Sequence, residues 1–80
     1  GTFNLYGFSR MVPDRGEVNY YFVEQAGGDA LPINEETFDD FVRKNMYHDS
    51  YIREKVDTKA WDYKNVVNVF RKYNARTAKK

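Results

Sequence analysis

Residues 3–25 read FNLYGFSRMVPDRGEVNYYFVEQ, two aromatic-rich segments on either side of Val12-Pro13-Asp14-Arg15-Gly16. Aromatic and β-branched residues favour the pleated surface of a sheet. The connecting sequence supplies a proline, whose fixed φ suits a turn, and a glycine, which can adopt a positive φ. The pattern predicts a β-hairpin with strands over residues 2–11 and 17–25. In the second strand, alternation separates Val18, Tyr20 and Phe22 on one face from Asn19, Tyr21 and Val23 on the other.

The glycines and prolines divide the chain into two parts. All five glycines and both prolines lie at or before Pro32, and the remaining 48 residues contain neither. Ala30-Leu31-Pro32-Ile33 is consistent with a third, short edge strand, because a proline removes a hydrogen-bond donor from a sheet. The second part has room for long regular elements, and we expect it to be helical.

A first helix begins after Asn34, which is a favourable N-cap residue. Glu35 and Glu36 follow it in the first turn, where negative charge is stabilising. Ile33 and Phe38 have the spacing of a hydrophobic staple. A shorter second helix is expected to begin near Asp49 or Ser50. The apolar stripes that we predict for these helices are Phe38, Phe41 and Val42 in the first, and Tyr51, Ile52 and Val56 in the second.

The last segment, residues 62–76, has a helical pattern. Its expected buried stripe has the spacing i, i+3, i+4, i+7 and i+11 and comprises Tyr63, Val66, Val67, Phe70 and Asn74. The competing interpretation is a strand, because Val66, Val67 and Val69 are strong β-formers. A strand would place apolar residues on both faces, whereas a helix gathers them on one, so we predict a helix.

These elements predict an α+β fold in one small domain, residues 1–80. An N-terminal β-hairpin, with a possible third short edge strand, packs on two or three C-terminal helices. The expected divisions are a hairpin region over residues 2–33, a helical region over residues 34–75 and a basic tail over residues 76–80. Aromatic residues make up 18% of the sequence, and large buried rings supply the core of such a small domain in the absence of cysteine.

The sequence contains no pattern typical of a catalytic or metal centre. His48 is the only histidine, and its neighbours Asp49 and Ser50 would point in different directions from a helix start. Glu35, Glu36, Asp39 and Asp40 are explained as a solvated acidic helix start, because the glycine of a calcium loop is missing. Gly27-Gly28 lacks the spacing of a phosphate-binding loop. We therefore predict no enzymatic activity, no catalytic or metal-binding residues and no cofactor.

The charge is polarised along the chain. The whole chain carries a net +1, but residues 64–80 contain six basic residues and no acidic one, so residues 1–63 carry −5. Clustered cations favour contact with nucleic-acid phosphates, although cations also stabilise any helix C-terminus. We predict DNA or RNA binding, with DNA preferred, through the last helix and the tail; the Arg15 turn is a second candidate contact. The predicted nucleic-acid-binding residues are Lys64, Asn68, Arg71, Lys72, Arg76, Lys79 and Lys80.

The alternative is a protein–protein interaction domain: an adaptor, an inhibitor or an oligomerising subunit. Tyr6, Tyr20 and Tyr21 exceed what one small core face needs, and exposed tyrosines anchor protein partners as well as unpaired bases. The acidic helix start at 35–40 is a candidate contact for a basic partner. An open sheet edge would also allow strand pairing between copies, so a homo-oligomer is a further possibility. Trp61 is expected in the core.

Asn4-Leu5-Tyr6-Gly7-Phe8-Ser9-Arg10 resembles the junction between recognition helix and strand in the winged-helix domains of heat-shock factors. Phe41-Val42-Arg43 and Ile52-Arg53-Glu54-Lys55-Val56 are similar to a later stretch of that family. The similarity covers about a dozen scattered positions. The family's DNA-reading residues would precede Asn4, so the resemblance assigns no site residue in this sequence.

No apolar run approaches the length of about 20 residues that a membrane-spanning helix needs. We expect no membrane partner. The expected location is intracellular, either cytoplasmic or associated with a nucleoid.

Overall fold

The N-terminal half forms a long antiparallel hairpin. In the computed structural model, which describes residues 1–25 and 27–78, β1 (Phe3–Val12) pairs with β2 (Gly16–Gln25) along their whole length. The Arg15 N–H donates to the Val12 carbonyl across the turn, and Gly16 adopts a φ of +72°. A residue with a Cβ is strained at this φ, so glycine suits the end of the turn. The predicted hairpin and its turn are confirmed to within one or two residues.

The third strand is short and lies at the sheet edge. β3 (Leu31–Ile33) pairs antiparallel with residues 21–23 of β2, so the strand order is β1-β2-β3. Pro32 is tolerated there because an edge strand does not need every N–H group for pairing. The sheet therefore has β1 and β3 as its two edges, and the expected edge strand is confirmed.

The C-terminal half is helical, as predicted. It contains α1 (Glu35–Asn45), α2 (Ser50–Asp57), a 3-10 turn (Tyr63–Asn65) and α3 (Val66–Ala78). Asn34 caps α1 by accepting hydrogen bonds from the N–H groups of Glu36 and Thr37, and Asp49 caps α2 in the same manner. The fold is α+β, with the helices packed against the three-stranded sheet. None of the described helices is long and apolar enough to cross a lipid bilayer.

The expected stripe of α3 was partly wrong. Val66 and Phe70 are buried as predicted, but Val69 and Tyr73 complete the buried face, while Val67 is 39% exposed. The prediction counted helical turns from Tyr63, whereas residues 63–65 form a 3-10 turn with fewer residues per turn. That turn shifts the phase of the helix that follows.

The helical region also extends beyond its expected end. α3 continues through Ala78, so residues 76–78 are helical and do not belong to a tail. Lys79 and Lys80, the other residues of the expected tail, lie outside the described part of the chain.

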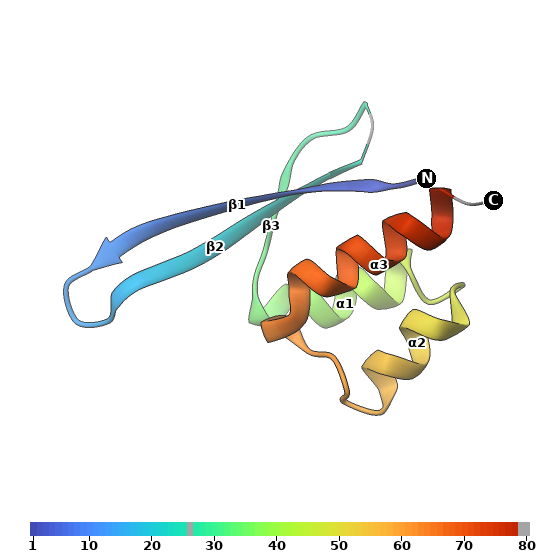
Figure 1. The fold of residues 1–80 in the computed structure, drawn as a ribbon. Coiled ribbons are helices and arrows are strands. Elements are labelled where there is room, and N and C mark those ends of the chain that lie inside the picture. The colour runs from blue at the N-terminus through green and yellow to red at the C-terminus, as the bar shows by residue number, and fades with distance from the viewer. Residues whose placement is uncertain (26, 79–80) are drawn as a thin grey trace.

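One face of the sheet carries the core. Phe3, Val23 and Ile33 point toward the helices, and α1 contacts β3 while α3 contacts β1. The hairpin tip extends away from the helical body, as Figure 1 shows, and the molecule measures 44 × 32 × 18 Å. The core comprises Phe3, Val23, Ile33, Phe38, Val42, Met46, Ile52, Val56, Val66, Val69, Phe70 and Tyr73.

The other face of the hairpin is covered by none of the described helices and is rich in aromatic side chains. Its residues alternate with the core-facing ones, and two cross-strand pairs, Tyr6 with Phe22 and Phe8 with Tyr20, form its centre. The rings of Phe8 and Tyr20 stack with centroids 5.6 Å apart, and Phe8 is 50% exposed. We call this surface the outer aromatic face; its residues are Tyr6, Phe8, Tyr20 and Phe22.

Candidate nucleic-acid interface

The exposed side of α3 carries most of the predicted basic residues. Asn68, Arg71 and Lys72 are exposed on this helix, and Lys64 is exposed in the 3-10 turn that precedes it. The three residues of α3 share the side opposite Val66, Val69 and Phe70, as the helical period requires. The structure therefore brings Asn68, Arg71 and Lys72 to one side of α3, with Lys64 before the start of the helix.

The basic residues on this side of α3 lie against different neighbouring elements, β1 and α2. Arg71 lines a shallow groove between α3 and β1. Lys72 lies on the opposite flank, where its Nζ is 5.2 Å from the centre of the Tyr51 ring on α2. Lys64 lies at the other end, beside a cavity that Glu35, Asp39 and Asp62 also line. Since these carboxylates offset its charge, Lys64 contributes less positive potential than its exposure suggests.

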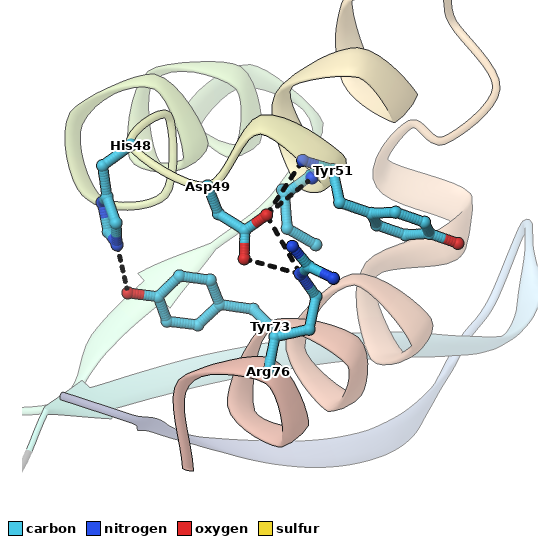
Figure 2. Close-up of polar contacts among 6 residues, drawn as sticks. His48, Asp49, Tyr51, Tyr73 and Arg76 are labelled. Carbon is cyan, nitrogen blue, oxygen red and sulfur yellow. Dashed lines mark hydrogen bonds and ion pairs between the residues drawn. The ribbon is translucent and has the colours of Figure 1, made fainter. Parts of the chain in front are cut away.

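Arg76 differs from the other predicted residues because it is already paired. Its Nε donates to both carboxylate oxygens of Asp49, at 2.8 Å and 3.1 Å, as Figure 2 shows. The Asp49 side chain is 4% exposed, whereas that of Arg76 is 41% exposed. The sequence pattern treated Arg76 as part of a solvated arm; the structure instead fixes it between α3 and the start of α2.

Asp49 is held in its charged form by several donors. Burial would raise the pKa of Asp49, but the Arg76 hydrogen bond, the N–H groups of Ile52 and Tyr51 and the Arg76 charge hold it below its ordinary value. The hydrogen bond with Asp49 correspondingly raises the pKa of Arg76. The same carboxylate therefore caps α2 and orients Arg76.

Three cations converge on the ring of Tyr51. Besides Lys72, the Arg76 Cζ lies 5.0 Å from the centre of this ring, and the Lys55 Nζ lies 5.5 Å from it. Cations within about 6 Å of a ring centre are attracted by its π-face. We call these four residues the Tyr51 cluster: Tyr51, Lys55, Lys72 and Arg76.

Trp61 extends the Tyr51 cluster on the α2 side. Its ring meets Tyr51 edge to face with centroids 6.0 Å apart, and the Lys55 Nζ lies 5.7 Å from its centre. Trp61 was expected in the core, but it is half-buried at the rim. Sequence reasoning missed Lys55 and Tyr51 as site residues because their closeness to α3 depends on how α2 packs. The only sequence signal was the placement of Lys55 one turn after Tyr51.

His48 and Asp49, although adjacent in sequence, face different partners. His48 is exposed, and its Nε2 lies 3.2 Å from the hydroxyl of Tyr73, while Asp49 faces Arg76 instead (Figure 2). The acidic start of α1 is exposed. Across residues 1–25 and 27–78, histidine and carboxylate side chains form no group of three able to hold a metal ion.

Comparison with known proteins adds no relative. No protein-family model, curated protein or solved structure matches this chain.

Proposed function

We propose that this protein binds nucleic acid, with DNA as the preferred ligand, through the Tyr51 cluster and the exposed side of α3. The observation that carries the proposal is the convergence of Lys55, Lys72 and Arg76 on one ring. Only Asp49 forms an ion pair with the cluster in the described residues, and it is buried. Packing thus holds a surplus of positive charge at the surface, which a phosphate backbone would neutralise.

The size and composition of the surface also favour an extended polyanion. A 13-residue helix such as α3 is about 20 Å long, enough to face several phosphates, since each strand of a duplex carries one phosphate per about 3.4 Å of the duplex axis. Arg71 and Asn68 lie on the same helix, and both residue types can read base edges as well as contact phosphates. Lys79 and Lys80, which follow α3 in the sequence, would extend the contact.

The test is fluorescence anisotropy with short single- and double-stranded DNA and RNA, titrated with salt. The variant Lys55→Gln/Lys72→Gln removes two charges from the Tyr51 cluster. The control Lys44→Gln/Lys59→Asn removes two lysines elsewhere, so it has the same net charge as the cluster variant. Asparagine is used at position 59 because it tolerates the positive φ of Lys59. If both lysines of the cluster variant contact phosphates of duplex DNA, the magnitude of the negative slope of log K against log salt falls by about 0.9 for each lysine removed.

We expect binding that weakens steeply with salt, a loss of about tenfold in affinity for the cluster variant, which corresponds to about 1.4 kcal/mol, and a smaller loss for the control. Equal losses in the two variants would place the contact elsewhere. No binding to any of the four nucleic acids at low salt would refute the proposal.

A protein-interaction module is the second candidate function, and the outer aromatic face favours it. Phe8, Tyr6 and Tyr20 are 50%, 43% and 37% exposed on the same face of the hairpin. Exposed contiguous apolar surfaces of this kind mark interaction sites. The face carries Arg10 and Glu24 at its two ends, so its net charge is near zero and it offers little attraction to phosphate.

A further inference from the structure

Within residues 1–25 and 27–78, the open edge of β1 has a defined set of unpaired backbone groups. Asn74 on α3 bonds to the outward side of Phe3: the Phe3 N–H donates to Oδ1 at 2.9 Å, and Nδ2 donates to the Phe3 carbonyl at 2.6 Å. Phe3 therefore turns its backbone groups away from β2. Because this direction alternates along an antiparallel strand, every second residue of β1 also faces the open edge. These residues are Leu5, Gly7, Ser9 and Met11.

This edge lacks the features that usually prevent strand pairing. Edge strands are commonly short, or carry proline or several charges. β1 is ten residues long, contains no proline and has one charged residue, Arg10. Asn74 protects Phe3 alone. The segment from Leu5 to Met11 is thus available to another strand.

We propose that two copies of this chain pair antiparallel through β1, with Phe8 on the twofold axis. In this register Leu5 lies opposite Met11 of the second copy, and Gly7 lies opposite Ser9. All four open residues are then paired, and Phe3 stays with Asn74. A shift of the axis to Gly7 would bring Met11 opposite Phe3, and a shift to Ser9 would bring Leu5 opposite Pro13, which has no N–H.

Charges on the outer face are complementary in the same register. Arg10 of one copy lies opposite Tyr6 of the other, within reach of a cation–π contact. The Tyr6 hydroxyl donates to Glu24 at 3.1 Å, so the Arg10 guanidinium would also approach this carboxylate. Twofold symmetry creates the contact twice. The pairing thereby joins the two oppositely charged ends of the outer aromatic face.

Apolar side chains on the inner face match as well. Met11 is 73% exposed near the hairpin tip, on the same face as Leu5. A groove of about 340 Å³ lies between β1 and α3, lined by Leu5, Gly7, Val67 and Arg71 among others. Opposite Leu5, Met11 of the second copy would lie over this groove and cover Val67. Methionine is flexible and fits irregular apolar surfaces of this kind.

Disulfide trapping tests the pairing and its register together. The chain contains no cysteine, so each introduced thiol is unique. In the proposed dimer the two Phe8 residues form a pair without mutual hydrogen bonds, with Cα atoms about 4.5 Å apart, which a disulfide can span. Phe8→Cys should therefore form a covalent dimer in a glutathione redox buffer. Circular dichroism of the reduced variant checks that it is folded.

Two single variants serve as register controls. Tyr6→Cys alone and Arg10→Cys alone should remain monomeric, because in each dimer the two thiols are several residues apart along the strands. An equal mixture of the two should cross-link, since position 6 of one copy faces position 10 of the other. Cross-linking of Tyr6→Cys with itself as fast as Phe8→Cys would overturn the register, and no cross-linking of Phe8→Cys would overturn the dimer.

Sedimentation velocity on the protein without cysteines, and on variants in which the charges of Arg10 and Glu24 are reversed, is an independent test of the dimer. We expect sedimentation velocity to show a concentration-dependent dimer for the wild type. Arg10→Glu and Glu24→Arg should each shift the protein to monomer, and the double variant should recover the dimer. A wild type that sediments as a monomer at every concentration contradicts the proposal.

A second copy of this chain is thus a specific partner for the second candidate function, the protein-interaction module. The proposed dimer is independent of the proposed nucleic-acid binding. The β1 edge and the Tyr51 cluster share no residue. A wild type that stays monomeric at every concentration but binds DNA in a salt-dependent manner would refute this inference alone. A dimer without nucleic-acid binding would refute the other proposal alone.

Discussion

Asp49 is the residue whose role combines local structure and tertiary structure. Its place before Ser50 was enough to predict a helix start, because aspartate accepts hydrogen bonds from the first N–H groups of a helix. Its ion pair with Arg76, 27 residues away, was beyond sequence reasoning. The pairing requires α2 and α3 to pack side by side, and no local pattern encodes that arrangement.

Replacement of Asp49 by asparagine separates these two roles. Asp49→Asn retains a side-chain oxygen for the cap but loses the charge opposite Arg76. We expect the free energy of unfolding at neutral pH to fall by about 1 to 3 kcal/mol, because charged hydrogen bonds at a buried site are lost. The control Asp39→Asn breaks an exposed ion pair with Arg43 and should change the free energy of unfolding little. Urea denaturation measures both, and equal effects would contradict the structural role of Asp49.

The same carboxylate makes stability depend on pH in a defined direction. The pKa of Asp49 is lower in the folded protein than its ordinary value of about 3.9. Its contribution is therefore complete above that ordinary value and is lost as the pH falls through the folded pKa. Between pH 5 and pH 2, roughly, Asp49→Asn should lose less stability than the wild type. Denaturation midpoints across this range give the comparison, and parallel curves would exclude the linkage.

At the level of elements, α3 is attached to the sheet by an amide. Asn74 pairs with both backbone groups of Phe3 as a neighbouring strand would, and Phe3 itself is buried against Phe41, Phe70 and Tyr73. Sequence spacing placed Asn74 in the buried stripe of this helix without a reason for its polarity. The reason is the unsatisfied edge of β1, which becomes apparent only when the helix and the strand lie together.

Removal of this amide should loosen the attachment. Asn74→Ala leaves the half-buried N–H and carbonyl of Phe3 without partners, and we expect a loss of about 1 to 3 kcal/mol in the free energy of unfolding. The amide proton of Phe3 should also exchange faster with deuterium. Asn68→Ala, on the exposed side of the same helix, is the matched control and should behave as wild type. An unchanged exchange rate at Phe3 would show that Asn74 is not the attachment.

The hairpin shows how much a strand pattern predicts. Turn residues and alternation predicted its strands, and Gly7 has a specific role within it. A Cβ at position 7 would lie 3.1 Å from Cε1 of Tyr21, the residue opposite. The absence of a side chain at Gly7 lets the Tyr21 ring lie across β1. The same ring contacts that of Tyr63 edge to face. The sequence pattern assigned no role to Gly7; its close contact with Tyr21 follows from the pairing.

On the scale of the whole molecule, the two faces of the sheet differ in their packing. The inner face and the helices form the core, while the outer aromatic face and the β1 edge remain uncovered. The Tyr51 cluster lies on the helical body, where α2 meets α3. A chain of 80 residues thus has a small core and two uncovered surfaces of different chemistry, one cationic and one aromatic with little net charge.

Stability measurements can distinguish the core from the uncovered face. Ile52 is fully buried, so Ile52→Ala should lower the free energy of unfolding by about 2 to 5 kcal/mol. Phe8→Ala removes more atoms but from a half-exposed ring, so less apolar surface returns to water and the expected loss is smaller than for Ile52→Ala. The comparison is made at concentrations where the protein is monomeric. A larger loss for Phe8 than for Ile52 would give the outer aromatic face a structural role within one chain.

The sequence by itself determined the local structure: the hairpin and its turn, the edge strand at Pro32, the cap at Asn34, a helix start near Asp49 or Ser50, and the α+β class. Each of these depends on neighbouring residues, whose backbone preferences act within a few positions. Tertiary structure alone decided the pairing of Arg76 and the convergence of Lys55 and Lys72 on Tyr51. Those features depend on distances between elements far apart in the chain, which are set when the buried faces pack together.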